Sequence, residues 1–298
     1  MDKIKIGIPR ALSYYYFGSK WEKFFEILNI EIIKSPPTDK NIVEAGNMLA
    51  NDEMCLPLKI YLGHVDYLKD KCDYILIPRI DNYGIFDQTC TNFLAIYDIV
   101  NNLFDVKIID YNIDINNDQD ELNGFLKIGK ILGIEKESVV KVYNKCKEYS
   151  DDLEKNLIKE NNNKLNDSRK KILLVAHKYT IYDDYIGQPV INYLNELGVD
   201  IIYSDRFCTK LTNKLAYNLS KNIYFKYPKE SIGSIELVKG SIDGIIFFTT
   251  FPCGLDSLVN ELVMRKIDKP YLNLIVDDMD SLTGIKTRLE SFVDILEQ

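Results

Sequence analysis

The chain has 298 residues, of which 46% are hydrophobic and 28% charged, a composition typical of globular proteins with room for two ordinary domains. Its 37 Lys and Arg residues against 45 Asp and Glu residues give a net charge of −8, and the sequence contains no basic block. The electrostatic footprint of a nucleic-acid-binding protein is therefore missing, and we expect no nucleic-acid partner.

The N-terminal segment "MDKIKIGIPR" carries charge where a signal peptide needs an apolar core, and no stretch approaches the ~18 apolar residues that span a bilayer. We therefore expect a cytoplasmic protein that does not associate with membranes. In a reducing compartment the six cysteines are not expected to pair as disulfides, so each is a small buried apolar residue or a metal or redox ligand.

The first predicted elements recur about 169 residues later in the chain. Residues 5–35 lie over residues 173–204 with at most one residue of slack. The matched pairs are Tyr16 with Tyr185, Gly18 with Gly187, Leu28 with Leu197, Ile32 with Ile201, Ile33 with Ile202, and Ser35 with Ser204. Each copy reads as a short β-branched strand, a helix with apolar residues at helical spacing, and a second strand, which is the start of a βαβ unit.

A third strand follows in each half, because "CDYILIPRI" (72–80) lies over "IDGIIFFTT" (242–250) at an offset of 170. Strands that alternate with helices predict a mostly parallel sheet. Residues 148–171 are charged and amide-rich, and we interpret them as an exposed helix end and linker. The sequence therefore predicts an α/β fold of two similar lobes, residues 1–168 and 169–298, each a mostly parallel sheet flanked by helices, with an interlobe cleft.

Three cysteines occupy loops where such folds bind ligands, beyond the carboxyl ends of strands and before helices. Cys253 directly follows the strand "GIIFFTTF" and precedes a helix for which Asp256 is the expected N-cap. Cys90 holds the related position in the first lobe, and Cys55 precedes a helix that Pro57 begins. Spacing alone leaves open whether these three are unrelated buried thiols or thiolates that together hold an iron-sulfur cluster with one iron left open.

The other three cysteines, Cys72, Cys146 and Cys208, are interpreted as structural or incidental. The sequence contains no CxxC pair, so neither a typical zinc site nor a bacterial ferredoxin run is supported. A glycine-rich P-loop is also missing, and we do not expect the chain to hydrolyse ATP by itself.

Several segments, taken together, resemble the 2-hydroxyacyl-CoA dehydratase family, specifically its activase-related iron-sulfur proteins. The resemblance rests on "IGIPRALSYYYFGSKWEKFFEILNIEIIKSPPT", "NDEMCLPLKIYLGHVDYLKDKCDYILIPRI", "HKYTIYDDYIGQPVINYLNELGVDII", "TTFPCGLDSLVNELV" and "KPYLNLIVDDMDSLTGIKTRLESFVDIL", in order along nearly the whole chain. The resemblance implies a 4Fe-4S cluster held by three cysteines between α/β lobes, with electrons supplied by a separate ATP-dependent activator or another redox protein. By motif, the implied ligands are Cys55, Cys90 and Cys253.

The chain departs from the family pattern at two places. Thr91 follows Cys90 where the family often has proline, and Asp277, Asp278 and Met279 stand where it often has Asp-Glu-His. The second departure weakens any claim that dehydratase chemistry is intact.

Few other polar residues suggest chemistry. His177, at the carboxyl end of "ILLVAHK", and Tyr185, in a strand-to-helix loop, are candidates for lining the cleft or supporting the ligands, as is Asp256. His64 is interpreted as a packed helix residue, and the aspartates beside Tyr185 as helix caps.

Three functions follow as hypotheses. The first is an iron-sulfur protein in low-potential electron transfer or reductive chemistry on a small substrate, whose identity and catalytic residues the sequence does not indicate. The second is a cluster-free module that binds a small ligand or serves as a partner subunit, with three incidental cysteines. The third is a 2-hydroxyacyl-CoA dehydratase component. A homodimer is compatible with each.

Overall fold

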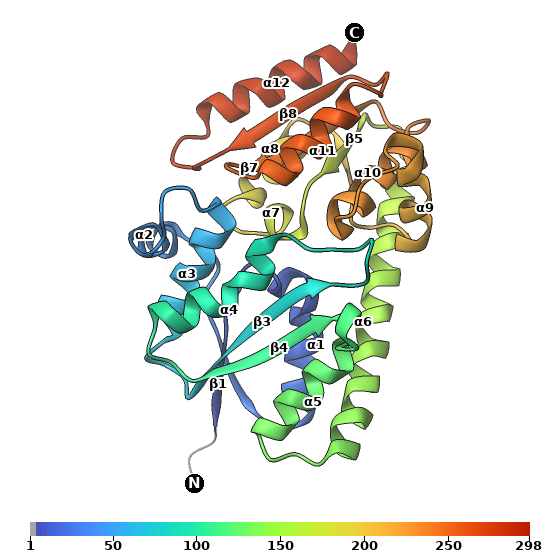
Figure 1. The fold of residues 1–298 in the computed structure, drawn as a ribbon. Coiled ribbons are helices and arrows are strands. Elements are labelled where there is room, and N and C mark those ends of the chain that lie inside the picture. Colours follow the sequence, from blue (N-terminus) through green and yellow to red (C-terminus); the bar gives the residue numbers. More distant parts are fainter. Residues whose placement is uncertain (1–3) are drawn as a thin grey trace. The chain divides into compact units, whose positions relative to one another are not determined.

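The computed structural model describes residues 4–298, which form two compact units, unit 1 up to Leu153 and unit 2 from Glu154 to Gln298. Each unit contains one four-stranded sheet, parallel throughout and flanked by helices (Figure 1). The predicted α/β fold with two similar parallel-sheet lobes is confirmed. The division between the units lies inside a helix, and the boundary expected near residue 168 stays a prediction.

Unit 1 has the strand order β2-β1-β3-β4. Its elements are β1 (Lys5–Ile8), α1 (Tyr14–Ile27), β2 (Glu31–Lys34), α2 (Lys40–Leu49), α3 (Leu56–Leu68), β3 (Tyr74–Asn82), α4 (Thr91–Leu103), β4 (Ile108–Asp114), the 3-10 helix η1 (Ile115–Asn117), α5 (Glu121–Ile131) and α6 (Lys136–Lys164), whose last residues belong to unit 2. The apolar residues of the central strands β1 and β3, mostly isoleucine, are buried on both faces, as expected for a sheet that helices cover on both sides.

Unit 2 has the equivalent strand order, β6-β5-β7-β8. Its elements are β5 (Lys171–Val175), α7 (Lys178–Ile181), α8 (Gly187–Glu196), β6 (Asp200–Tyr203), α9 (Thr209–Leu219), α10 (Lys226–Val238), β7 (Gly244–Thr250), α11 (Gly254–Met264), β8 (Tyr271–Val276) and α12 (Thr283–Glu297). Every residue of β7 is buried, so this strand lies at the centre of the core.

The same hydrogen bonds fix the first crossover in both units. Ser35 Oγ accepts from Arg10 N at 2.9 Å in unit 1, and Ser204 Oγ accepts from Ala176 N at 3.5 Å in unit 2. Both serines follow the second strand of their sheet and are almost fully buried. The predicted match of Ser35 with Ser204 is therefore a match of structural roles, which supports the interpretation of the two units as copies of one fold.

The predicted slack of one residue between the copies is wrong at the first strand. Lys5 pairs with Glu31 in unit 1 and Lys171 with Asp200 in unit 2, so the first strands correspond at an offset of 166 and the second strands at 169. Unit 2 therefore has three additional residues after its first strand. The short helix α7 occupies this place, between β5 and α8.

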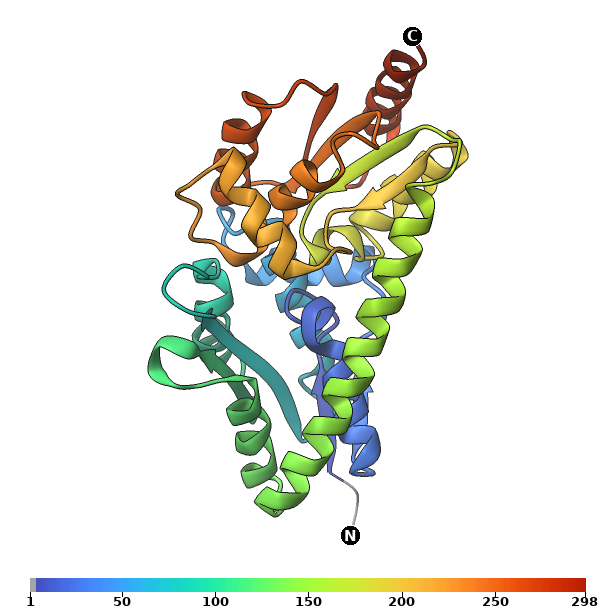
Figure 2. The same ribbon diagram turned by 90° about the vertical axis from the view of Figure 1, so that its right-hand side faces the viewer.

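The predicted linker is mostly helical. α6 is one continuous helix of 29 residues, drawn in green in Figure 2, and it ends only at Lys164. Its residues 151–157 are exposed, as expected, but Asn161 is 1% exposed and bonds to the backbone of Tyr203. Within residues 4–298 no helix combines the length and the apolar character needed to cross a bilayer.

The helix that follows Cys55, α3, packs against α2 at unusually short range. A Cβ on Gly63 would lie 2.0 Å from the carbonyl oxygen of Ile42, a backbone atom that cannot rotate away. Gly233 has the same relation to Thr212 in the α9/α10 pair, at 1.9 Å. Glycine is required at both places because only a residue without Cβ permits this approach of two backbones.

We expect Gly63→Ala to lower the free energy of unfolding by about 1–3 kcal/mol, because α2 and α3 must separate to admit the methyl group. Gly240→Ala is the control, since no atom lies within 4 Å of its added Cβ. Thermal unfolding followed by circular dichroism measures both. Equal melting temperatures for the two variants would contradict the close approach.

His64 is confirmed as a packed helix residue. Its side chain is fully buried in α3, and its Nε2 lies 3.0 Å from Thr38 Oγ1. Burial, followed by the charge of Arg10, lowers the pKa of His64 to about 3. The folded protein therefore keeps this imidazole neutral at pH values where the unfolded chain protonates it.

This depressed pKa predicts a loss of stability in acid. Between the folded and unfolded pKa values the unfolded state binds the additional proton, so the free energy of unfolding falls as the pH drops below about 6.5. We expect the wild type to lose about 2 kcal/mol more than His64→Gln between pH 7 and pH 5. Urea unfolding followed by the fluorescence of Trp21, the only tryptophan and a buried residue of unit 1, measures the difference. Parallel pH dependences would contradict the assignment.

Candidate functional site

Cys55 and Cys90 are the N-cap residues of two helices of unit 1, α3 and α4. Both have an extended backbone, with φ and ψ of −65° and 150° for Cys55 and −63° and 144° for Cys90. Neither thiol caps its own helix by a side-chain hydrogen bond. The two sulfur atoms are therefore presented at helix N-termini, where unpaired N–H groups and the helix dipole favour negative charge.

The structure brings these two predicted ligands together. α3 contacts α4, and Asn92, in the first turn of α4, donates from Nδ2 to Cys55 Sγ at 3.4 Å. Burial raises the pKa of the Cys55 thiol, and the nearby charge of Cys90 raises this pKa further. Asn92 lies two residues after Cys90, so this bond places the N-terminus of α4 beside Cys55, and we call Cys55 and Cys90 the thiol pair of unit 1.

Cys253 occupies the corresponding place in unit 2. It is the N-cap residue of α11, and two residues separate it from the end of β7. Its N–H donates to Thr250 O at 3.0 Å. Pro252 lies in the short turn between the buried strand and the helix, and Gly254 is the first residue of the helix. The strand therefore delivers the cysteine directly to the N-terminus of the helix.

The structure corrects the expected role of Asp256. Cys253, not Asp256, is the N-cap residue of α11, and Asp256 lies in the first turn, 9% exposed. Its Oδ1 is 3.0 Å from Nε2 of His177, the residue before α7. The His177 ring also stacks on Tyr179, with 4.7 Å between centroids. Two sequence-predicted candidates therefore form one buried pair that ties the end of β5 to the first turn of α11.

Next to this pair is a recess of about 10 Å³, which has room for about one water molecule. Its lining residues are Val175, Ala176, His177, Pro228, Ser231, Ile232, Thr249, Asp256 and Asn260. Asn260 Nδ2 donates to Thr249 Oγ1 at 3.1 Å, and both residues are buried. Sequence reasoning missed this second polar pair because an amide within a helix and a threonine within a strand carry no distinctive signal. The recess is too small for an organic substrate.

Tyr185 lies apart from this recess. Its hydroxyl donates to Asp280 Oδ1 at 3.3 Å, and the tyrosine is half-buried. The neighbouring Asp183 is 1% exposed, and its Oδ1 accepts from the N–H groups of Tyr185 and Ile186, ahead of α8. The N-cap residue of α8 is Ile186, without a side-chain cap, so Asp183 closes the turn before the helix and the helix cap expected of an aspartate in this loop is not formed.

The other three cysteines occupy diverse places. Cys72 donates to Leu68 O at 3.3 Å, Cys146 is fully buried in α6, and Cys208 is exposed at the N-cap of α9. Across residues 4–298 no group of three or more His, Cys, Asp and Glu side chains is arranged to hold a metal ion. Because Cys208 shares its helix position with Cys55, Cys90 and Cys253, an N-cap position alone does not distinguish a ligand.

The family model described as "CoA enzyme activase uncharacterised domain (DUF2229)" matches residues 5–207. The chain belongs to this family. The match covers Cys55, Cys90 and His177 and ends before Cys253. The resemblance to activase-related proteins is thereby confirmed at this level, whereas a dehydratase assignment is not.

Comparison with solved structures finds matches of low identity. The metal-binding SBP FpvC from Pseudomonas aeruginosa in complex with Ni²⁺ has 12% identity and a TM-score of 0.32, covering 99% of this chain and 96% of its own. A periplasmic metal binding protein from Candidatus Liberibacter asiaticus has 12% identity and a TM-score of 0.29, covering 99% of each chain. At these TM-scores the likeness carries no argument about ligand or function. Comparison with curated proteins finds no match.

The raised pKa of Cys55 predicts slow alkylation. At pH 8 we expect iodoacetamide to modify Cys55 several-fold more slowly than the exposed Cys208, and the rate at Cys55 to keep rising towards pH 10, because the thiolate is the nucleophile. Cys90→Ser removes the neighbouring charge and should accelerate the reaction. Mass spectrometry of the alkylated peptides measures each rate. If Cys90→Ser left the rate at Cys55 unchanged, the two thiols would not be close.

Proposed function

We propose that the protein is the iron-sulfur component of a CoA-enzyme activation system, and that it works in low-potential electron transfer or reductive chemistry. The observation that carries this proposal is the convergence of Cys55 and Cys90 at two helix N-termini of unit 1. Membership of the activase family is the second support. The proposed cofactor is one 4Fe-4S cluster, which would supply the one-electron chemistry that amino-acid side chains lack.

The residues around the thiol pair fit an iron-sulfur cluster. A cluster needs thiolates, and helix N-termini favour the negative charge of a cluster with its thiolates. Asn92 donates to Cys55 Sγ, a kind of bond that tunes the potential of such sites. Burial keeps the Cys55 thiol protonated without metal, so we expect iron to displace this proton when it binds.

Cys253 is the proposed third ligand. Its support is the motif in the sequence and its position after β7, which is equivalent to that of Cys90 after β3. The buried bond between His177 and Asp256 holds the first turn of α11 in place beside Cys253. Three cysteines would leave one iron of a cubane cluster open to a substrate or another exogenous ligand.

The proposed partners follow from what the chain lacks and from its family. Its sequence has no P-loop, so we do not assign ATP hydrolysis to this chain. The proposed electron donor is either a separate ATP-dependent activator or another redox protein. The recipient would be a CoA-linked enzyme, in line with the family description. A small-molecule substrate of the open iron belongs to the same proposal, and its identity and the catalytic residues are unassigned.

Anaerobic reconstitution with iron and sulfide tests the cluster. We expect about four irons and four sulfides per chain, with a reducible cubane signal in electron paramagnetic resonance. Cys55→Ala, Cys90→Ala and Cys253→Ala should each lose the stoichiometric iron. Cys208→Ala is the matched control, because Cys208 is also a helix N-cap cysteine but lies outside the proposed set, and we expect it to reconstitute like the wild type.

The outcomes separate the parts of the proposal. If Cys253→Ala retained its iron while Cys55→Ala and Cys90→Ala lost it, Cys253 would not be a ligand. Cys55 and Cys90 of unit 1 would then remain as the ligands. A wild type that takes up no stoichiometric iron would overturn the cluster, and a ligand-binding module or partner subunit without a cluster would replace it.

A further inference from the structure

Each of the two sheets has two edge strands, and an unprotected edge is a template for pairing with another chain. The edges are β2 and β4 in unit 1, and β6 and β8 in unit 2. Three of these edges carry a recognisable protection, whereas the fourth, β8, has no charged residue in the strand itself, is partly exposed and has one carbonyl bonded to Arg288. The difference identifies β8 as a candidate interaction surface.

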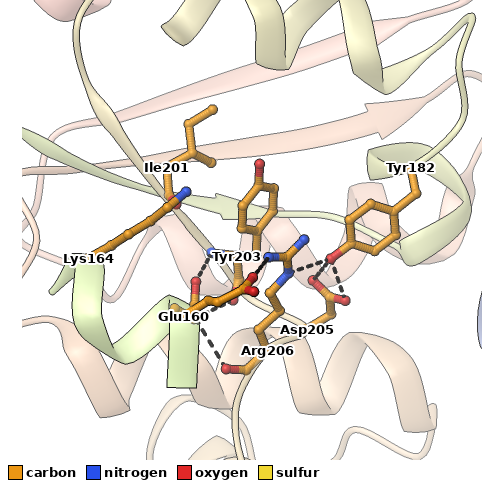
Figure 3. Close-up of polar contacts among 8 residues, drawn as sticks. Glu160, Lys164, Tyr182, Ile201, Tyr203, Asp205 and Arg206 are labelled. Atoms are coloured by element: carbon orange, nitrogen blue, oxygen red, sulfur yellow. Dashed lines mark hydrogen bonds and ion pairs between the residues drawn. The ribbon is translucent and has the colours of Figure 1, made fainter. Parts of the chain in front are cut away.

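The edge of β6 is covered by side chains of α6. Lys164 Nζ donates to Ile201 O at 3.4 Å, and Asn161 bonds to both the N–H and the C=O of Tyr203, at 2.9 and 3.1 Å (Figure 3). Arg206 lies over the Tyr203 ring at 4.2 Å and pairs with Glu160 of α6 at 3.7 Å. Three backbone groups of this edge, the C=O of Ile201 and both groups of Tyr203, are therefore occupied.

The two edges of unit 1 carry charge. β2 is four residues long and begins with Glu31 and ends with Lys34, both exposed. β4 contains Asp110 and Asp114, and an antiparallel pairing centred on Asn112 would place these two like charges opposite each other. Short length and charge are both known protections of an edge.

β8, with the sequence YLNLIV, has no charged residue and no proline. The carbonyls of Pro270 and Val276 accept from residues on the β7 side, so the N–H and C=O groups of Tyr271, Asn273 and Ile275 point away from the sheet. Tyr271 is 46% and Ile275 42% exposed. A hydrogen bond from Arg288 NH2 to Asn273 O reaches this edge, and the carbonyl oxygen keeps a second lone pair for another donor.

We propose that β8 pairs antiparallel with β8 of a second copy of this chain, which makes one continuous eight-stranded sheet from two copies of unit 2. In β8 the backbone groups of the odd-numbered residues, 271, 273 and 275, point outward. A two-fold axis through the middle of these three residues places Asn273 of one copy opposite Asn273 of the other. In this register Tyr271 faces Ile275, an aromatic residue opposite a β-branched one, at both ends of the pairing.

The charges that flank β8 complement each other in the same register. Lys269 of one copy comes opposite Asp277 of the other, and the two-fold axis repeats this pair. A six-residue strand pair alone falls short of the ~1,200 Å² that a specific interface buries. The helices α11 and α12 lie next to β8 (Figure 1). They carry exposed apolar side chains that can add to the buried area: Leu258 and Leu262 on α11 and Ile295 on α12.

Sedimentation equilibrium of the whole chain between 1 and 200 μM tests the pairing. We expect the mass to rise from 34.5 kDa towards twice this value as the concentration increases. Asn273→Pro removes the outward N–H at the centre of the pairing and leaves the bonds to β7, because proline is tolerated on an edge strand. This variant should stay monomeric, with circular dichroism and melting temperature close to those of the wild type.

A charge exchange tests the register. Asp277→Lys places Lys269 opposite another lysine and should raise the dissociation constant at least tenfold. Lys269 also donates to Ile242 O at 2.8 Å, so Lys269→Glu alone can disturb the fold, and the single variant of Asp277 carries the test.

Three results would overturn the proposal: a wild type that is monomeric up to 200 μM, a dimer that Asn273→Pro leaves intact, or larger open-ended species in place of a dimer. Slow amide exchange at Tyr271 and Asn273 that arises only when a different protein is added would assign this edge to that protein instead. The test needs no cluster, so its outcome is independent of the proposed function.

Discussion

Parallel strand pairing is the constraint on which the rest of this structure depends. Because β1 and β3, and likewise β5 and β7, run in the same direction, each connection must return across the sheet, and every strand ends at the same edge. Asp73 and Asp243 directly precede the third strand of their units, and the carboxylate of each accepts from the N–H of the first residue of the first strand at 2.8 Å. The chain then leaves the sheet into a helix N-terminus, where Cys90 or Cys253 lies.

The two units share this frame and differ in what they place in it. The third residue after the N-cap cysteine is Phe93 in α4, 3% exposed, and Asp256 in α11, which bonds to His177. Cys55, at the N-cap of α3, corresponds to Phe225 at the N-cap of α10. Unit 1 therefore has a thiol pair, whereas unit 2 has one thiol and a buried polar cluster. This asymmetry favours different roles for unit 1 and unit 2, although both place a cysteine at the N-terminus of the helix after the third strand.

The charged helix α6 protects one edge of the sheet in unit 2. Its exposed residues give it the composition of a linker, but Asn161 is buried and saturates the backbone of the edge strand β6. A polar side chain is suited to this position because an unpaired N–H or C=O at a sheet edge is otherwise left to water or to another chain. The other edge of unit 2, β8, has one such bond, from Arg288 to Asn273 O, and is the edge that we propose pairs with a second copy.

The sequence by itself determined the fold class, the duplication, and the placement of three cysteines between strands and helices, because burial on both faces and helical spacing leave local patterns. It also determined the packed role of His64, which lies among apolar residues of one helix. Only the tertiary structure decided that Cys55 and Cys90 lie close together, that Asp256 bonds to His177 and is not a cap, and that α7 accounts for the shifted offset of the repeat. These features depend on residues far apart in the chain, and their distances follow from packing, which no local pattern records.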